Sequence, residues 1–138
     1  MGRILAIDYG RKRTGLAVTD MLRITANPLL TLPTGELLKW LENYFKDNPV
    51  DEAVIGHPVQ LNGKDSESWQ YIRPFMETFR RTFPHIPLRE FDERFTSTLA
   101  HRAMIDGGMK RLKRQNKAAV DRLAACILLE DYLTYIQG

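Results

Sequence analysis

The sequence has only one cysteine, Cys126, among its 138 residues. A single thiol can form neither an intrachain disulfide nor a cysteine-rich zinc site, which excludes disulfide-stapled secreted domains and cysteine-based zinc modules. No apolar run reaches the roughly 20 residues of a membrane-spanning helix, and Asp8 interrupts the first apolar run before it reaches signal-peptide length. We therefore expect a soluble, cytoplasmic protein with no membrane segment.

The chain also lacks internal repeats, low-complexity tracts and long Gly-, Ser- or Pro-rich linkers. Its length suits one domain, and a hydrophobic content of 43% is enough to close one core. We expect a single domain over residues 1–138, with one functional site.

Positive charge is modest overall but gathered in two places. The formal net charge is +3 and the isoelectric point is about 9.1. Basic patches suit a phosphate backbone, although solvated lysine-rich loops are equally common. The candidate nucleic-acid-binding residues in these patches are Arg11, Lys12, Arg13, Lys110, Lys113, Arg114 and Lys117.

Hydrophobic periodicity and turn residues predict alternating strands and helices. We expect strands at 4–9, 16–19, 23–26, 52–55 and 88–91, and helices at 35–47, from 65 or 66 to 79, at 97–107 and at 118–136. Tight early connections imply antiparallel pairing, and long helical crossovers between the later strands imply parallel pairing. The predicted fold class is α/β, with a mixed five-stranded sheet flanked by helices.

Asp8 ends a strand that is otherwise apolar. Open α/β sheets commonly bind their ligands at such strand ends, so Asp8 is a candidate site residue. The alternative is an ordinary turn aspartate before Gly10.

Asp121 is more informative, because it shares a helical face with Ala125, Leu128 and Tyr132. A carboxylate on such an apolar face must be salt-bridged, neutralised by a raised pKa, or bound to a metal ion. The sequence leaves a salt bridge to one of the many arginines open.

A third acidic position follows the last predicted strand, at Asp92-Glu93-Arg94. Either acid can point toward the edge that carries Asp8, and Arg94 can hold a phosphate or orient a neighbouring acid. Three carboxylates there would suit hard divalent ions such as Mg²⁺ or Mn²⁺. Two such ions, roughly 3.5–4 Å apart, can hydrolyse a phosphodiester.

Other catalytic schemes have weaker support. Cys126 lies in an apolar helix and is expected to be a packed thiol. His57, His85 and His101 have no metal-ligand spacing, although His57 follows a strand and could touch substrate.

Four motifs occur in order along nearly the whole chain. They are Ile7-Asp8-Tyr9-Gly10 with Arg13-Thr14-Gly15-Leu16-Ala17-Val18, then Ile55-Gly56-His57-Pro58 with Leu61-Asn62-Gly63, then Asp92-Glu93-Arg94-Phe95-Thr96-Ser97, and finally Asn116-Lys117 with Val120-Asp121 and Ala124-Ala125. Together they resemble the YqgF/RuvX family, relatives of the RuvC Holliday-junction resolvase. Family members usually carry leucine at position 57 and aspartate at position 62, where this chain has His57 and Asn62.

The resemblance implies a ribonuclease H-like fold and a nuclease whose catalytic and metal-binding acids are Asp8, Glu93 and Asp121. It selects Glu93 over Asp92. It also implies a role in maturing the 5′ end of the small-subunit ribosomal RNA precursor, with RNA favoured over DNA as the partner.

Three other functions remain open at this point. A Holliday-junction resolvase would need a two-fold dimer, whereas the sequence is compatible with a monomer or a weak homodimer. An actin-like nucleotide-binding domain shares the opening Asp-x-Gly hairpin but normally needs a second domain. A non-catalytic RNA-binding module would keep the fold without the activity.

Overall fold

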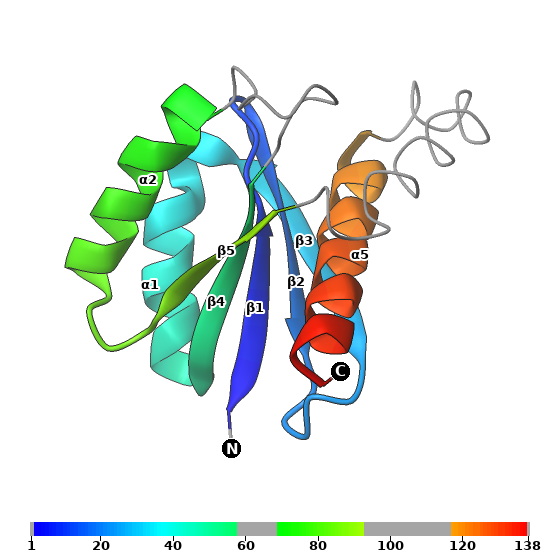
Figure 1. Cartoon of the computed structure of the whole chain (residues 1–138). Coiled ribbons are helices and arrows are strands. Elements are labelled where there is room, and N and C mark those ends of the chain that lie inside the picture. The colour runs from blue at the N-terminus through cyan, green and yellow to red at the C-terminus, as the bar shows by residue number, and fades with distance from the viewer. Residues whose placement is uncertain (1, 58–68, 93–116, 138) are drawn as a thin grey trace.

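A computed structural model describes residues 2–57, 69–92 and 117–137. These residues form a five-stranded sheet with the order β3-β2-β1-β4-β5 and three long helices (Figure 1). The elements in chain order are β1 (Arg3–Asp8), β2 (Arg13–Thr19), β3 (Ala26–Pro33), the short 3-10 helix η1 (Thr34–Glu36), α1 (Leu37–Asp47), β4 (Val50–His57), α2 (Trp69–Thr82), β5 (Leu88–Asp92) and α5 (Lys117–Gln137). The predicted short helix at 97–107 lies outside the described residues.

The strand directions confirm the predicted mixed sheet. β1 pairs antiparallel with β2, and β2 pairs antiparallel with β3. β4 lies parallel to both β1 and β5. This is the ribonuclease H-like arrangement that the resemblance implies, and it brings the carboxyl ends of β1, β4 and β5 to one edge of the sheet, here called the carboxyl edge.

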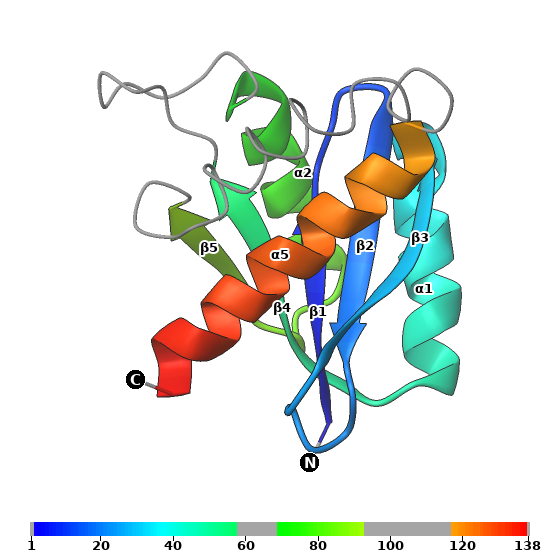
Figure 2. The same ribbon diagram turned by 90° about the vertical axis from the view of Figure 1, so that its right-hand side faces the viewer.

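Helices cover both faces of the sheet. α1 and α2 lie on one face, and α5 crosses the other face diagonally (Figures 1 and 2). Each strand sends alternate side chains to the two faces. In β1, Leu5 and Ile7 join the cluster under α1 and α2, whereas Ile4 and Ala6 join the cluster under α5.

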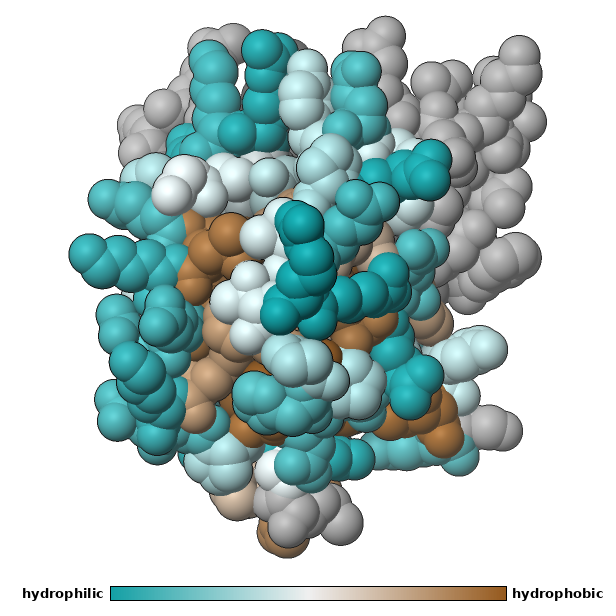
Figure 3. All heavy atoms as spheres, turned by 90° about the vertical axis from the view of Figure 1, so that its left-hand side faces the viewer, coloured by the Kyte–Doolittle hydropathy of each residue, from teal (hydrophilic) through white to brown (hydrophobic). Residues whose placement is uncertain are grey.

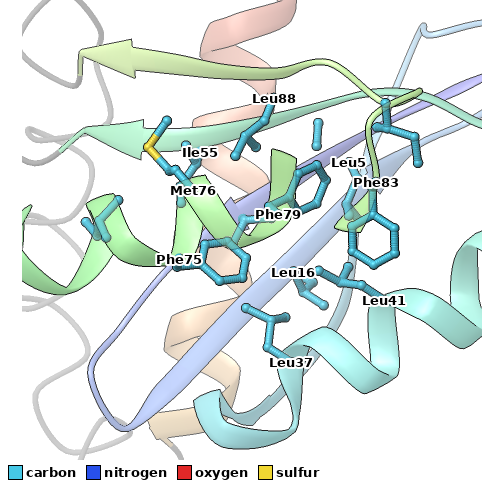
Figure 4. Close-up of a cluster of buried hydrophobic side chains, with 14 of the residues drawn as sticks. Leu5, Leu16, Leu37, Leu41, Ile55, Phe75, Met76, Phe79, Phe83 and Leu88 are labelled. Carbon is cyan, nitrogen blue, oxygen red and sulfur yellow. The ribbon is translucent and has the colours of Figure 1, made fainter. Parts of the chain in front are cut away.

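The cluster under α1 and α2 is built around aromatic side chains. Phe75 and Phe79 of α2, with Phe83 just beyond it, pack over Leu5 and Leu16 of the sheet (Figure 4). From outside, mainly hydrophilic side chains cover this layer, with apolar atoms visible between them (Figure 3). The helical spacing that predicted α2 is therefore the spacing of its core contacts.

A local signal explains where α1 ends, whereas α2 runs on through a proline. The backbone N–H and the side-chain amide of Asn48 both donate to the carbonyl oxygen of Tyr44, at 3.0 and 3.1 Å. This caps α1 just before Pro49, as predicted. α2 continues through Pro74, whose carbonyl oxygen accepts a 3.0 Å hydrogen bond from the Thr78 hydroxyl.

A third strand is present, but its predicted bounds of 23–26 are wrong, because β3 begins at Ala26 and runs to Pro33. One carboxylate oxygen of Asp20 accepts hydrogen bonds from the backbone N–H groups of Ile24 (2.7 Å) and Thr25 (3.0 Å). Arg23 has a φ of 58°, so this segment is a turn. Pro28 does not end the strand, because β3 is an edge of the described sheet and a missing N–H is tolerated there.

No helix within the described ranges is both long enough and apolar enough to cross a membrane.

Candidate active site

Asp8 is the last residue of β1, at the carboxyl edge and in the middle strand of the sheet. It is half-buried and lies opposite Gly15 of β2. Because Ile4 and Ala6 face α5, the alternation of β1 directs Asp8 toward the α5 side. The sequence predicted the position of Asp8 but not which face it occupies.

The turn that follows Asp8 is fixed by Thr34. The Thr34 hydroxyl donates to the carbonyl oxygen of Gly10 at 2.6 Å, and its backbone N–H donates to the carbonyl oxygen of Lys12 at 3.0 Å. The Thr34 and Thr14 hydroxyls also lie 2.9 Å apart. A Cβ on Gly10 would collide with the carbonyl oxygen of Arg13, so this close approach requires glycine.

The basic residues of this turn, Arg11, Lys12 and Arg13, are exposed at the carboxyl edge. The Arg11 guanidinium lies 5.1 Å from the centre of the Tyr71 ring in α2, within the range of a cation–π contact. Sequence reasoning missed Tyr71, because a contact between residues so far apart in the chain leaves no local signal. The turn therefore presents cations where a phosphate backbone could approach Asp8.

The aromatic ring of Tyr9 points into the α1 and α2 layer. Its ring centre lies 4.7 Å from that of Phe75, and burial raises the pKa of the Tyr9 hydroxyl. This contact anchors the end of β1 against α2. Tyr9 directly follows Asp8, the last residue of β1, and its side chain lies on the opposite face of the sheet from that of Asp8.

Asp121 belongs to α5, in the turn before Ala125. Ala125 and Leu128 have no exposed surface and Tyr132 is 4% exposed, all in the cluster between α5 and the sheet. These three burials confirm the apolar face predicted for the helix. The first turns of α5 lie toward the carboxyl edge in Figure 1, but the Asp121 side chain is outside the described part.

Several predicted site residues cannot be placed. Glu93, Arg94, Lys110, Lys113 and Arg114 lie outside the described residues, as do the side chains of His57, Asp92, Lys117 and Asp121. Within the residues that are described, no group of three or more His, Cys, Asp or Glu side chains is arranged to hold a metal ion. The structure therefore places one of the three predicted acids, Asp8, and the helix that carries another.

Cys126 is a packed thiol, as predicted. It is buried, its sulfur lies 3.4 Å from the carbonyl oxygen of Ala26, and burial and the nearby Glu130 carboxylate raise its pKa. A buried thiol with a raised pKa is a poor nucleophile. The contact of Cys126 with Ala26 is therefore a packing contact between α5 and β3.

Comparisons with known proteins find similarity along almost the whole chain. The model of the RuvX family, described as "Holliday junction resolvase", matches residues 2–135. A protein of Phocaeicola vulgatus named "Putative pre-16S rRNA nuclease" is 53% identical over 133 residues, which is 96% of each chain. Proteins with the same name from Parabacteroides distasonis and Flavobacterium psychrophilum are 51% and 47% identical, and cover 96% and 97% of this chain and 95% and 98% of their own length.

Proposed function

This chain belongs to the RuvX family, and from that membership we propose that it is a nuclease that cleaves phosphodiester bonds in the precursor of 16S ribosomal RNA. Relatives about half identical to it over nearly their whole length carry that name. The finer role, maturation of the 5′ end, rests on the resemblance in the motifs, and a cytoplasmic location rests on the single cysteine and the short first apolar run.

One structural observation carries the proposal: Asp8 faces α5 at the carboxyl edge. Asp121 occupies the same helix, one turn before the buried Ala125. In a helix, residues four apart share a face, and the sequence predicts that Asp121 shares the face of Ala125. On that prediction, two acids from separate elements would lie at the carboxyl edge on the α5 side of the sheet.

The third acid in this proposal is Glu93, because the resemblance selects it over Asp92. β5 ends at Asp92, so Glu93 directly follows this strand in the sequence.

The donor chemistry of the three acids fits a divalent metal ion. Asp8, Glu93 and Asp121 offer carboxylate oxygens, which Mg²⁺ and Mn²⁺ prefer, and these three residues would hold the ions. When bound, such ions supply a water nucleophile at neutral pH and stabilise the charge on the leaving oxygen.

The chain's own residues bind and orient the substrate. Arg11, Lys12 and Arg13 provide positive charge beside Asp8 for the phosphates on either side of the cleaved bond. Arg94, next to Glu93, would hold the scissile phosphate or orient an acid. In the overall hydrolysis, the water oxygen bonds to phosphorus, the bond to the leaving oxygen breaks, and that oxygen gains a proton.

Substitution of Asp8 tests the proposal directly. Purified wild type, Asp8→Asn and Asp47→Asn would be incubated with precursor 16S RNA, with Mg²⁺, Mn²⁺ or EDTA. Asp47 is an exposed acid at the end of α1 and serves as the matched control. We expect Asp8→Asn to lose more than about 100-fold in cleavage rate, since even an outer-shell partner of a metal site costs about 10- to 100-fold. Undiminished cleavage by Asp8→Asn would refute the assignment.

The family description favours a second candidate, resolution of four-way DNA junctions. That reaction needs paired cuts and therefore a two-fold dimer, whereas our expectation is a monomer or a weak homodimer. Cleavage of a synthetic junction without cleavage of the RNA would select this alternative. Binding of RNA without cleavage of either substrate would select a non-catalytic module.

A further inference from the structure

A pocket of about 620 Å³ lies between β5 and the last turns of α5. Its volume is in the range of small-ligand sites, roughly 300–1,000 Å³. The residues that line this pocket include Glu52, Arg89, Phe91, Tyr132 and Tyr135. None of these residues has a role in the catalytic proposal above.

A fixed carboxylate forms the polar wall of this pocket. The Tyr132 hydroxyl donates to Oε2 of Glu52 at 2.9 Å, and Nε of Arg89 donates to the same oxygen at 3.1 Å. The Glu52 side chain is only 15% exposed, whereas that of Arg89 is 61% exposed. The carboxylate is thus held in place as an acceptor, and the arginine remains accessible to a solvent-borne phosphate.

Aromatic rings form the other walls. The Phe91 ring packs edge-on against Tyr132 and Tyr135, with ring centres 5.4 and 5.2 Å apart. Tyr132 is buried, but Tyr135 is 67% exposed. The exposed Tyr135 ring packs against the buried Phe91 ring, and an exposed ring supported in this way is a suitable platform for a flat aromatic ligand.

The pocket lies on the same side of the sheet as Asp8. Ile7 pairs with Ile55, which pairs with Glu90, so the next row of the sheet contains Asp8, Gly56 and Phe91. Phe91, like Asp8, is on the α5 side. Neighbouring strands are about 4.8 Å apart, which puts Phe91 about 10 Å from Asp8 across the sheet. Glu52 pairs with Ile4, four residues before Asp8, so at about 3.3 Å per residue the polar wall of the pocket lies roughly 14 Å from Asp8.

We propose that this pocket binds one unpaired nucleobase of the RNA substrate, a few nucleotides from the cleaved phosphodiester. The base stacks on Tyr135, an exocyclic amino group of the base donates to Glu52, and Arg89 binds the adjoining phosphate. This inference rests on the proposed function, and it adds a preference for bases that carry an amino group over uracil.

A second copy of the chain, paired along the outer side of β5, fits the pocket less well than RNA does. If two β5 strands paired antiparallel about a two-fold axis, a register centred on Arg89 or on Glu90 would place that residue opposite its own copy. A register centred on Phe91 would place Glu90 opposite Asp92. Like charges that face each other directly destabilise a strand pair.

The test measures RNA binding without cleavage. A short, fluorescently labelled single-stranded RNA of mixed sequence is titrated in EDTA with wild type, Tyr135→Phe, Tyr135→Ser and Leu22→Ser. Because Tyr135→Ser loses one stacked base, it should bind RNA about 5- to 150-fold more weakly than wild type, the equivalent of roughly 1–3 kcal/mol. Tyr135→Phe keeps the ring and should bind like wild type. Leu22, 69% exposed in the turn between β2 and β3, is the control for losing an exposed apolar side chain.

A second measurement tests the role of Glu52. Cytidine and uridine monophosphate are titrated into wild type and Glu52→Gln while the amide resonances of α5 and β5 are followed. Wild type should bind the cytidine nucleotide several-fold more tightly, and Glu52→Gln should lose that preference. Equal binding of both nucleotides by wild type would overturn the assigned role of Glu52.

The outcomes separate this inference from the proposed function. If precursor RNA is cleaved but Tyr135→Ser binds RNA as tightly as wild type, the pocket is not a base site and the nuclease assignment stands. If binding depends on Tyr135 but no substrate is cleaved, the pocket stands and the nuclease assignment fails. Binding of a basic peptide at Tyr135 in place of RNA would overturn the inference in favour of a protein partner.

Discussion

At the scale of single residues, the alternation of side chains along a strand decides which groups can meet. Asp8 and Tyr9 are adjacent in sequence, yet Tyr9 packs on Phe75 of α2 while Asp8 belongs to the α5 side. Glu52 likewise points toward α5, where it accepts the hydrogen bond of Tyr132. A shift of one residue in any of these strands would take the acid to the other face.

Tyr132 provides a test of pH dependence. Burial, and then the hydrogen bond to the Glu52 carboxylate, raise its pKa from 10.0 to about 12. Because the raised pKa favours the protonated phenol in the folded state, the stabilisation is complete below pH 10 and is lost as the pH rises from about 10 through about 12.

We therefore expect Tyr132→Phe to be less stable than wild type at neutral pH by about 1–3 kcal/mol. The difference in free energy of unfolding should disappear between about pH 10 and pH 12, because only wild type has a phenol to ionise there. Urea denaturation followed by circular dichroism at several pH values measures it. If the free energies of unfolding of the two proteins changed with pH in the same way, the assigned hydrogen bond would be contradicted.

At the scale of elements, the turn between β1 and β2 is held from two sides. Thr34, at the start of η1, bonds the carbonyl oxygens of Gly10 and Lys12. On the other side, Tyr71 of α2 contacts the Arg11 guanidinium. The turn thus carries its cations in a defined position beside Asp8, although its residues are exposed.

This arrangement predicts different effects for Arg11 and Tyr71 on RNA binding. Arg11→Ala should lower the slope of log affinity against log salt concentration by about 1, because one phosphate contact is lost. Tyr71→Leu keeps the charge and should weaken affinity only about 2- to 5-fold, the equivalent of an exposed cation–π contact of about 0.5–1 kcal/mol. Tyr71→Phe should restore it.

Lys46→Ala is the control for these measurements, since Lys46 is a similarly exposed cation in the last turn of α1. Fluorescence anisotropy at several salt concentrations gives both affinity and slope. If Arg11→Ala left the slope unchanged, the basic turn would be an ordinary solvated loop.

At the scale of the whole molecule, one sheet separates two apolar clusters that differ in character. The cluster under α1 and α2 is rich in phenylalanine, whereas that under α5 contains mainly small and aliphatic residues along a single long helix. The proposed chemistry lies at the end of the α5 cluster, where the sequence predicts Asp121 on the apolar face of the helix. Function would therefore be obtained there at the expense of stability.

Asp121→Leu tests this conflict. If Asp121 is retained for chemistry, leucine should raise the melting temperature at neutral pH and abolish cleavage, since a carboxylate on an apolar face costs free energy unless it is paired or bound to a metal ion. Differential scanning calorimetry and the RNA cleavage assay measure the two effects. A large fall in melting temperature would instead show that Asp121 forms a structural salt bridge. Asp47→Leu, at the exposed end of α1, is the control and should change neither.

The sequence by itself determined the three long helices of the described residues and most strands, because apolar periodicity and caps such as Asn48 are local signals. It also singled out Asp8 and Asp121 by their positions in apolar elements. It failed at β3, where the Asp20 turn and an edge position for Pro28 depend on neighbouring chain. Only the tertiary structure placed Asp8 on the α5 side, brought Tyr71 to Arg11 and formed the pocket around Glu52, because each depends on residues far apart in sequence packing together.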